Sequence, residues 1–105
     1  MARISVEELR NLLDQGKLPV ILDVRSPFAQ RQDGRIPGAI PIDAQTFGDT
    51  PPLPSTGEVI VYCACPNEAS AALIAKGLIR QGYSRVRPLQ GGIDAWIAAG
   101  YAIER

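Results

Sequence analysis

The fold is decided by Glu58-Val59-Ile60-Val61-Tyr62-Cys63, an unbroken run of mainly apolar and β-branched residues. Such a run predicts a strand that is buried on both faces, as strands of a parallel sheet are. After a short polar segment, a helix is predicted over Ala69–Ile79, ending at Gly82, because apolar residues recur there at helical spacing: Ala72, Leu73, Ile74 and Leu78. Strand, tight loop and helix in this order are typical of an α/β fold.

The same kinds of element are predicted on both sides of this stretch. Short apolar runs predict strands over 20–24, 39–42 and 85–89. Ser5 and Glu8 have the spacing of a capping box, which predicts a first helix that runs to about Asp14. Helical spacing predicts a closing helix over 93–97. Between the strands at 20–24 and 58–63, many Gly and Pro residues leave room for one helical turn, over 28–32.

The chain has 105 residues, which is the length of one ordinary domain, so residues 1–105 are predicted to form a single domain. Alternating strands and helices predict an α/β layer fold with a mainly parallel sheet and right-handed crossovers. Ligands of such sheets bind beyond the carboxyl ends of the strands. Cys63 and the residues that follow it are therefore the candidates for a functional site.

Charge and composition exclude several function classes. Lys plus Arg number 11 and Asp plus Glu number 11, so no net field attracts nucleic acid or an anionic membrane surface. No apolar stretch approaches the roughly 18 residues that span a bilayer, so we expect no membrane insertion of this chain. Histidine is absent, which excludes an imidazole base, and two cysteines are too few for an ordinary metal site.

The two cysteines, Cys63 and Cys65, are two positions apart and cannot close a long structural loop, so they are expected to be reduced thiols. A sulfur beside a helix N-terminus faces unpaired backbone N–H groups and the positive end of the helix dipole. Both favour the thiolate, which is the nucleophilic form. The same N–H groups would hold an anionic group attached to the sulfur.

Four motifs in order resemble the signatures of single rhodanese domains. They are Leu22-Asp23-Val24-Arg25-Ser26-Pro27, Gly34-Arg35-Ile36-Pro37-Gly38-Ala39, Val61-Tyr62-Cys63, and Leu89-Gln90-Gly91-Gly92-Ile93-Asp94-Ala95-Trp96. The resemblance covers nearly the whole chain, from Ile4 to about Tyr101. It implies a three-layer fold in which a five-stranded, mainly parallel sheet is flanked by helices.

The resemblance also implies a function. Cys63 would be the catalytic cysteine, which accepts sulfane sulfur from a small donor, thiosulfate or a persulfide, and passes it to a thiol or cyanide. No metal or organic cofactor is implied, and a monomer is favoured. The string from Tyr62 to Ser70 is similar to a variant loop of rhodanese domains appended to membrane proteins of the DedA type. We therefore expect a cytoplasmic protein or a cytoplasmic-facing domain of a membrane protein.

The loop that would surround the sulfur departs from the family pattern, which commonly runs Cys, two residues, Gly, one residue, Arg. Pro66 stands at the glycine position and Glu68 at the arginine position of Cys63-Ala64-Cys65-Pro66-Asn67-Glu68-Ala69-Ser70. Pro66 removes an N–H donor and Glu68 adds a negative charge, and both changes oppose the binding of thiosulfate. A non-catalytic module that binds a partner or senses redox state is the alternative to a sulfurtransferase.

Two further hypotheses concern the same loop. With Cys65 as N-cap, Pro66 at the first helical position and Glu68 at the third, Cys65 would be the more reactive thiol. A disulfide between Cys63 and Cys65 would let Cys65 resolve a persulfide. A related cysteine phosphatase would need an arginine at position 69, where the sequence has Ala69.

Three charged residues outside the loop are weaker candidates for a supporting role. Asp23 and Arg25 stand at the end of the first predicted strand and are expected to form an internal ion pair that fixes the chain there. Arg35 stands where the family often has histidine. It is expected to be a solvated turn residue, with recruitment of an anionic sulfur donor as the alternative.

Overall fold

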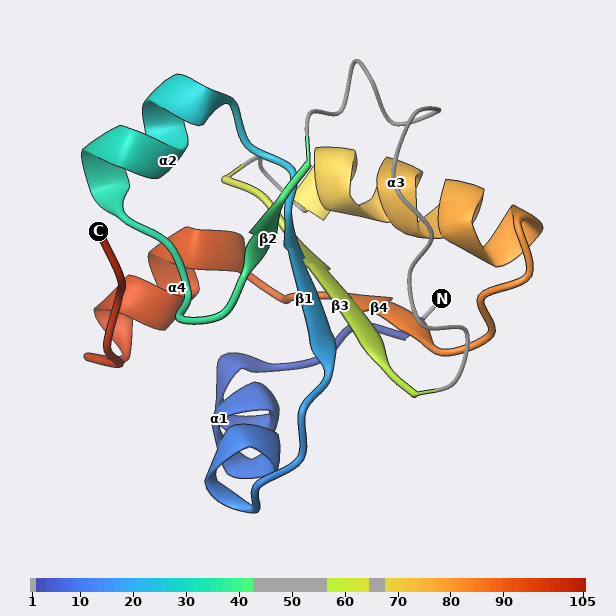
Figure 1. Cartoon of the computed structure of the whole chain (residues 1–105), viewed down its shortest axis with the longest axis horizontal. Helices are drawn as coiled ribbons and strands as arrows, with labels where there is room; N and C mark the ends of the chain where they lie inside the picture. Colours follow the sequence, from blue (N-terminus) through green and yellow to red (C-terminus); the bar gives the residue numbers. More distant parts are fainter. Residues whose placement is uncertain (1, 43–56, 65–67) are drawn as a thin grey trace.

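The computed structural model describes residues 2–42, 57–64 and 68–105 (Figure 1). Helices and strands alternate along most of the chain, as the sequence pattern predicts. The helices are α1 (Val6–Asp14), α2 (Pro27–Asp33), α3 (Ala69–Arg80) and α4 (Gly92–Ala98), and the strands are β1 (Val20–Asp23), β2 (Ile40–Pro41), β3 (Val59–Tyr62) and β4 (Val86–Pro88). The capping box predicted at α1 is present: the Ser5 hydroxyl accepts from the Glu8 N–H, and the Glu8 carboxylate accepts from the Ser5 N–H.

The strands form a parallel sheet in the order β2-β1-β3-β4. Within the described residues the sheet has four strands rather than the five that the family resemblance implies. In the fifth place, along the outer edge of β4, lies Ile4, whose N–H donates to Pro88 O (3.0 Å) and whose carbonyl accepts from Gln90 N–H (2.8 Å). Because only one residue pairs before the helix cap at Ser5, this contact is a bridge and not a strand.

The sheet is covered on both faces, which gives the predicted three layers (Figure 1). Successive side chains of a strand point to opposite faces, and β3 shows this directly. Ile60 and Tyr62 pack in a core with residues of α1 and α4. Val59, Val61 and Cys63 pack in a second core with residues of α3. Every residue of β3 is buried, as the unbroken apolar run predicts.

A buried ion pair fixes the carboxyl end of β1. Arg25 Nη2 lies 2.7 Å from Asp23 Oδ2, and the side chains are 3% and 0% exposed. The Arg25 backbone N–H also donates to Asp23 Oδ1 (3.0 Å). This confirms the internal ion pair that the sequence predicts. Burial lowers the pKa of Arg25, but the hydrogen bond and charge of Asp23 outweigh burial, so the net pKa is raised.

The ion pair extends into a network that joins three segments. Asp23 accepts from the hydroxyl of Tyr62, the last residue of β3 (2.8 Å), and the Tyr62 oxygen accepts from the Ile36 N–H (3.2 Å). Arg25 donates to the Gly34 carbonyl (2.6 Å). Burial, and then the Asp23 charge, raise the pKa of Tyr62, so its hydroxyl stays protonated and donates. The carboxyl ends of β1 and β3 are thereby tied to the segment before β2.

The start of α4 packs directly on the end of β3. The Ile93 N–H donates to the Cys63 carbonyl oxygen (3.1 Å). Gly92 has φ +59°, and a Cβ atom built on it would overlap that same oxygen. Only glycine allows both the left-handed backbone and this close approach. The second glycine of the last sequence motif is therefore explained by contact with Cys63, whereas a Cβ atom on the first, Gly91, would overlap the Ala95 side chain.

None of the helices among the described residues is both long and apolar enough to cross a membrane.

We predict that Asp23→Asn lowers the free energy of unfolding by about 3–5 kcal/mol, because it leaves the Arg25 cation buried without a compensating charge. Asp14→Asn is the matched control, since Asp14 forms an ion pair of similar length with Arg10 (2.8 Å) but is 61% exposed. The control is expected to cost at most about 1 kcal/mol. Urea unfolding of the two variants tests this, and equal costs would contradict it.

Gly92→Ala is predicted to cost about 3 kcal/mol or more, because a left-handed backbone and a clash with the Cys63 carbonyl act together. Gly100→Ala separates the two effects, since Gly100 has φ +79° but nothing lies within 4 Å of its added Cβ. That control is expected to cost about 1–2 kcal/mol. Thermal unfolding measured side by side would refute the close-packing argument if Gly100→Ala were as costly.

Candidate active site

The candidate nucleophile, Cys63, follows directly after Tyr62 at the carboxyl edge of the parallel sheet. This is where ligands of open α/β sheets bind. Its backbone is held by the Ile93 N–H, and its side chain belongs to the core under α3. Cys63 is buried, with only 2% of the residue exposed. The next residue, Ala64, is exposed.

The central part of the loop, Cys65, Pro66 and Asn67, lies outside the described residues. The hypothesis that Cys65 is an alternative or resolving thiol thus stays a prediction. The same holds for the disulfide between Cys63 and Cys65. The two ends of the loop, at Ala64 and Glu68, are described.

The predicted start of α3 at Ala69 is confirmed, but the alternative hypothesis for this loop is not. The N-cap is Glu68 and the helix begins at Ala69, so the prediction of Cys65 as N-cap with Glu68 at the third helical position is wrong. Glu68 has φ 56° and ψ 36°, a left-handed conformation that no residue inside a right-handed helix adopts. Its side chain makes no capping bond to the helix, because the carboxylate is engaged elsewhere.

The Glu68 carboxylate is buried, with the residue 5% exposed. One oxygen accepts from Arg3 Nη1 (2.8 Å) and the other from the Gly91 N–H (3.3 Å). The negative charge that the sequence places in the loop is therefore paired with a cation from the N-terminal segment. No local pattern in the sequence signals this contact, since Arg3 and Glu68 are 65 positions apart.

The other sequence-predicted candidates lie in structural roles. Asp23 and Arg25 form the buried pair described above and contact the neighbour of Cys63, Tyr62, through its hydroxyl and ring. Arg35 pairs with Glu104 twice, through two backbone hydrogen bonds and through an ion pair of 3.5 Å between their side chains. These contacts agree with a turn residue. The recruitment of a sulfur donor by Arg35 stays a prediction.

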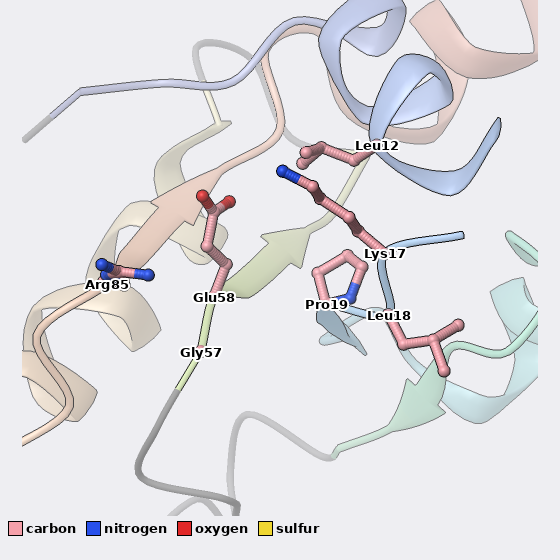
Figure 2. A pocket seen from close by; sticks show the side chains of 7 residues that line it. All are labelled: Leu12, Lys17, Leu18, Pro19, Gly57, Glu58 and Arg85. Atoms are coloured by element: carbon pink, nitrogen blue, oxygen red, sulfur yellow. The ribbon is translucent and has the colours of Figure 1, made fainter. Parts of the chain in front are cut away.

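A cavity of about 250 Å³ lies at the opposite end of the sheet from Cys63 (Figure 2). Its wall includes Pro19, Glu58 and Arg85, which directly precede β1, β3 and β4, so it opens at the amino ends of the strands. The other lining residues are Leu12, Lys17, Leu18 and Gly57. None of them is a nucleophile suited to sulfur chemistry, so this cavity is not the candidate active site.

Across residues 2–42, 57–64 and 68–105, no group of three or more His, Cys, Asp and Glu side chains is placed to hold a metal ion.

Known proteins resemble this chain along almost its whole length. A family model described as "Rhodanese-like domain" matches residues 5–99. A sulfurtransferase of Allochromatium vinosum is 31% identical over 101 residues, which cover 95% of this chain and 92% of that protein. The adenylyltransferase and sulfurtransferase UBA4 of Candida albicans is also 31% identical over 101 residues, covering 90% of this chain but only 23% of that protein.

A solved structure gives the same assignment. The crystal structure of a rhodanese-like domain protein from Staphylococcus aureus superposes with a TM-score of 0.84 at 27% identity and covers all of both chains. The chain therefore matches one whole sulfurtransferase and about a quarter of a larger one. On the family model, the relatives and the fold together, this chain belongs to the rhodanese-like domain family and is homologous to sulfurtransferases.

Proposed function

We propose that this domain is a sulfurtransferase that carries sulfane sulfur as a persulfide on Cys63. The observation that supports it best is the position of Cys63, the first residue after the central strand β3, at the edge of the sheet where such folds bind ligands. Homology to proteins named as sulfurtransferases points the same way.

The proposed reaction has two displacement steps on sulfur. The Cys63 thiolate attacks the outer sulfur of thiosulfate, the S–S bond of the donor breaks, and sulfite leaves with the electron pair. A persulfide of a small thiol reacts in the same way and releases the thiolate. In the second step an acceptor thiolate attacks the terminal sulfur of the Cys63 persulfide. The sulfur passes to the acceptor and the Cys63 thiolate is restored.

The loop would stabilise the charge on the terminal sulfur. Backbone N–H groups of residues 64–69, other than Pro66, are the donors that the chain offers there, together with the N-terminus of α3. Persulfide donors are favoured over thiosulfate, because the loop has no arginine to bind a dianion. As reduced thiols, Cys63 and Cys65 would fit a reducing compartment such as the cytoplasm.

One observation favours the alternative, a rhodanese-like module that binds a partner or senses redox state without transferring sulfur. Cys63 is 2% exposed and its side chain packs in the core under α3. A buried cysteine in an apolar setting is by default unreactive. Reactivity of the Cys63 sulfur is therefore the property that separates the two functions.

Intact-mass spectrometry of the reduced protein after incubation with thiosulfate, and separately with a persulfide of a small thiol, tests the proposal. We predict an added mass of about 32 Da that appears in wild type and in Cys65→Ser, is absent in Cys63→Ser, and disappears on addition of cyanide. Cys63→Ser keeps the size of the side chain, so the fold is retained and the loss reports chemistry.

Two other outcomes would each overturn part of the proposal. An adduct that requires Cys65 and not Cys63 would move the nucleophile to the second thiol. The absence of an adduct with either donor, in a folded protein with titratable thiols, would leave the binding or redox module as the function.

A further inference from the structure

The turn at the start of α4 contacts the residues on either side of the loop that follows the candidate nucleophile. At the first end, the Ile93 N–H donates to the Cys63 carbonyl, against which Gly92 also packs. At the second end, the Gly91 N–H donates to the Glu68 carboxylate (3.3 Å). Three consecutive residues, Gly91 to Ile93, therefore fix where the loop leaves β3 and where it enters α3.

Arg3 holds the Glu68 carboxylate against this turn. Its Nη1 lies 2.8 Å from Glu68 Oε1, while Oε2 of the same carboxylate accepts from Gly91. The Glu68 side chain is 6% exposed and that of Arg3 is 48% exposed. A carboxylate this buried requires both a cation and a hydrogen-bond donor, and Arg3 and Gly91 supply them.

The backbone of Glu68 indicates that these contacts are needed. It is the single residue other than glycine with a positive φ among the described residues, at 56°. Left-handed backbone is unfavourable for a residue with a side chain, so surrounding contacts have to compensate for it. Among the described residues, Arg3 and Gly91 bind the carboxylate of Glu68.

We propose that Glu68, paired with Arg3, is a positioning residue for sulfur transfer: by holding the end of the loop on the Gly91–Ile93 turn, the pair fixes the backbone around Cys63. This inference rests on the proposed function, since it concerns the same site. Stabilisation of a sulfur anion by backbone N–H groups depends on their being held in place before the reaction. The carboxylate thus acts through the geometry of the loop, without contact with the substrate.

Glu68→Gly and Arg3→Ala test the proposal in a Cys65→Ser background, in which Cys63 is the single thiol. Glycine removes the carboxylate but is the residue best suited to the left-handed backbone at position 68, so the variant is expected to fold. The first measurement is the rate of sulfur loading from a persulfide of a small thiol, followed by intact mass. The second is hydrogen exchange of the Gly91 and Ile93 amides, which requires no sulfur chemistry.

We expect each variant to lower the loading rate about tenfold and to speed exchange of the Gly91 and Ile93 amides. Glu68→Gly is expected to change the melting temperature little, whereas Arg3→Ala lowers it, because it leaves the Glu68 carboxylate buried without a cation. The double variant is expected to lose no more than either single variant, because the two residues act as one unit. Arg3→Lys keeps a cation at this position and should recover part of the rate. Asp14→Ala breaks an exposed ion pair of the same length, Arg10 to Asp14, and should change nothing.

Each other outcome is decisive. Unchanged loading in Glu68→Gly would overturn the proposal, whether or not amide exchange speeds up. Additive losses in the double variant would show that Arg3 and Glu68 do not act as a pair. If the parent protein loads no sulfur, the proposed function fails, and exchange of the Ile93 amide alone then decides whether Glu68 positions the Cys63 backbone.

Discussion

The buried ion pair between Asp23 and Arg25 is the constraint on which the carboxyl edge of this sheet depends. Both side chains are almost fully removed from water. Loss of either partner would leave the other charge buried and uncompensated, which strongly destabilises a fold. Because the Tyr62 hydroxyl donates to the same carboxylate, the ends of β1 and β3 are held in register at the carboxyl edge. Cys63 follows Tyr62 directly, so the ion pair acts on the position of the sulfur through one peptide bond.

Because side chains alternate along β3, its last residue, Tyr62, and the next residue, Cys63, face opposite sides of the sheet. Tyr62 points into the core shared with α1 and α4 and completes the polar network, while Cys63 points into the core under α3. The backbone of Cys63 is in turn bound by the first turn of α4. The candidate nucleophile is therefore restrained from both layers of helices. Electrostatic stabilisation by a loop benefits from such rigid support.

Most of the fold was predictable because it follows from local patterns. The apolar run of β3, the helical spacing of α3 and the Ser5 capping box all predict elements that the structure contains. The buried ion pair was also predictable, since an acid and a cation two positions apart stand at the end of a buried strand. The fifth strand is reduced to Ile4 because the cap of α1 begins one residue later.

The candidate site was less predictable for a physical reason. The proline and glutamate after Cys65 favour a helix that has Cys65 as its N-cap. In the structure α3 begins at Ala69 instead, and Glu68 forms an ion pair across the fold with Arg3. The spacing of apolar residues along the sequence does not predict ion pairs between residues that are far apart in the chain. The placement of Cys63 at the sheet edge, by contrast, follows from the strand pattern alone.

Two adjacent residues of the N-terminal segment, Arg3 and Ile4, make contacts with different parts of the fold. Ile4 occupies the outer hydrogen-bonding edge of β4, and Arg3 binds the buried Glu68 carboxylate beside the candidate active-site loop. Without Ile4, the Pro88 carbonyl and the Gln90 N–H would lose the hydrogen bonds that they form with its backbone. The exposed edge of β4 could then pair with a strand of another chain. Loss of Arg3 and Ile4 would therefore expose the edge of β4 and leave the Glu68 carboxylate without its cation at the same time.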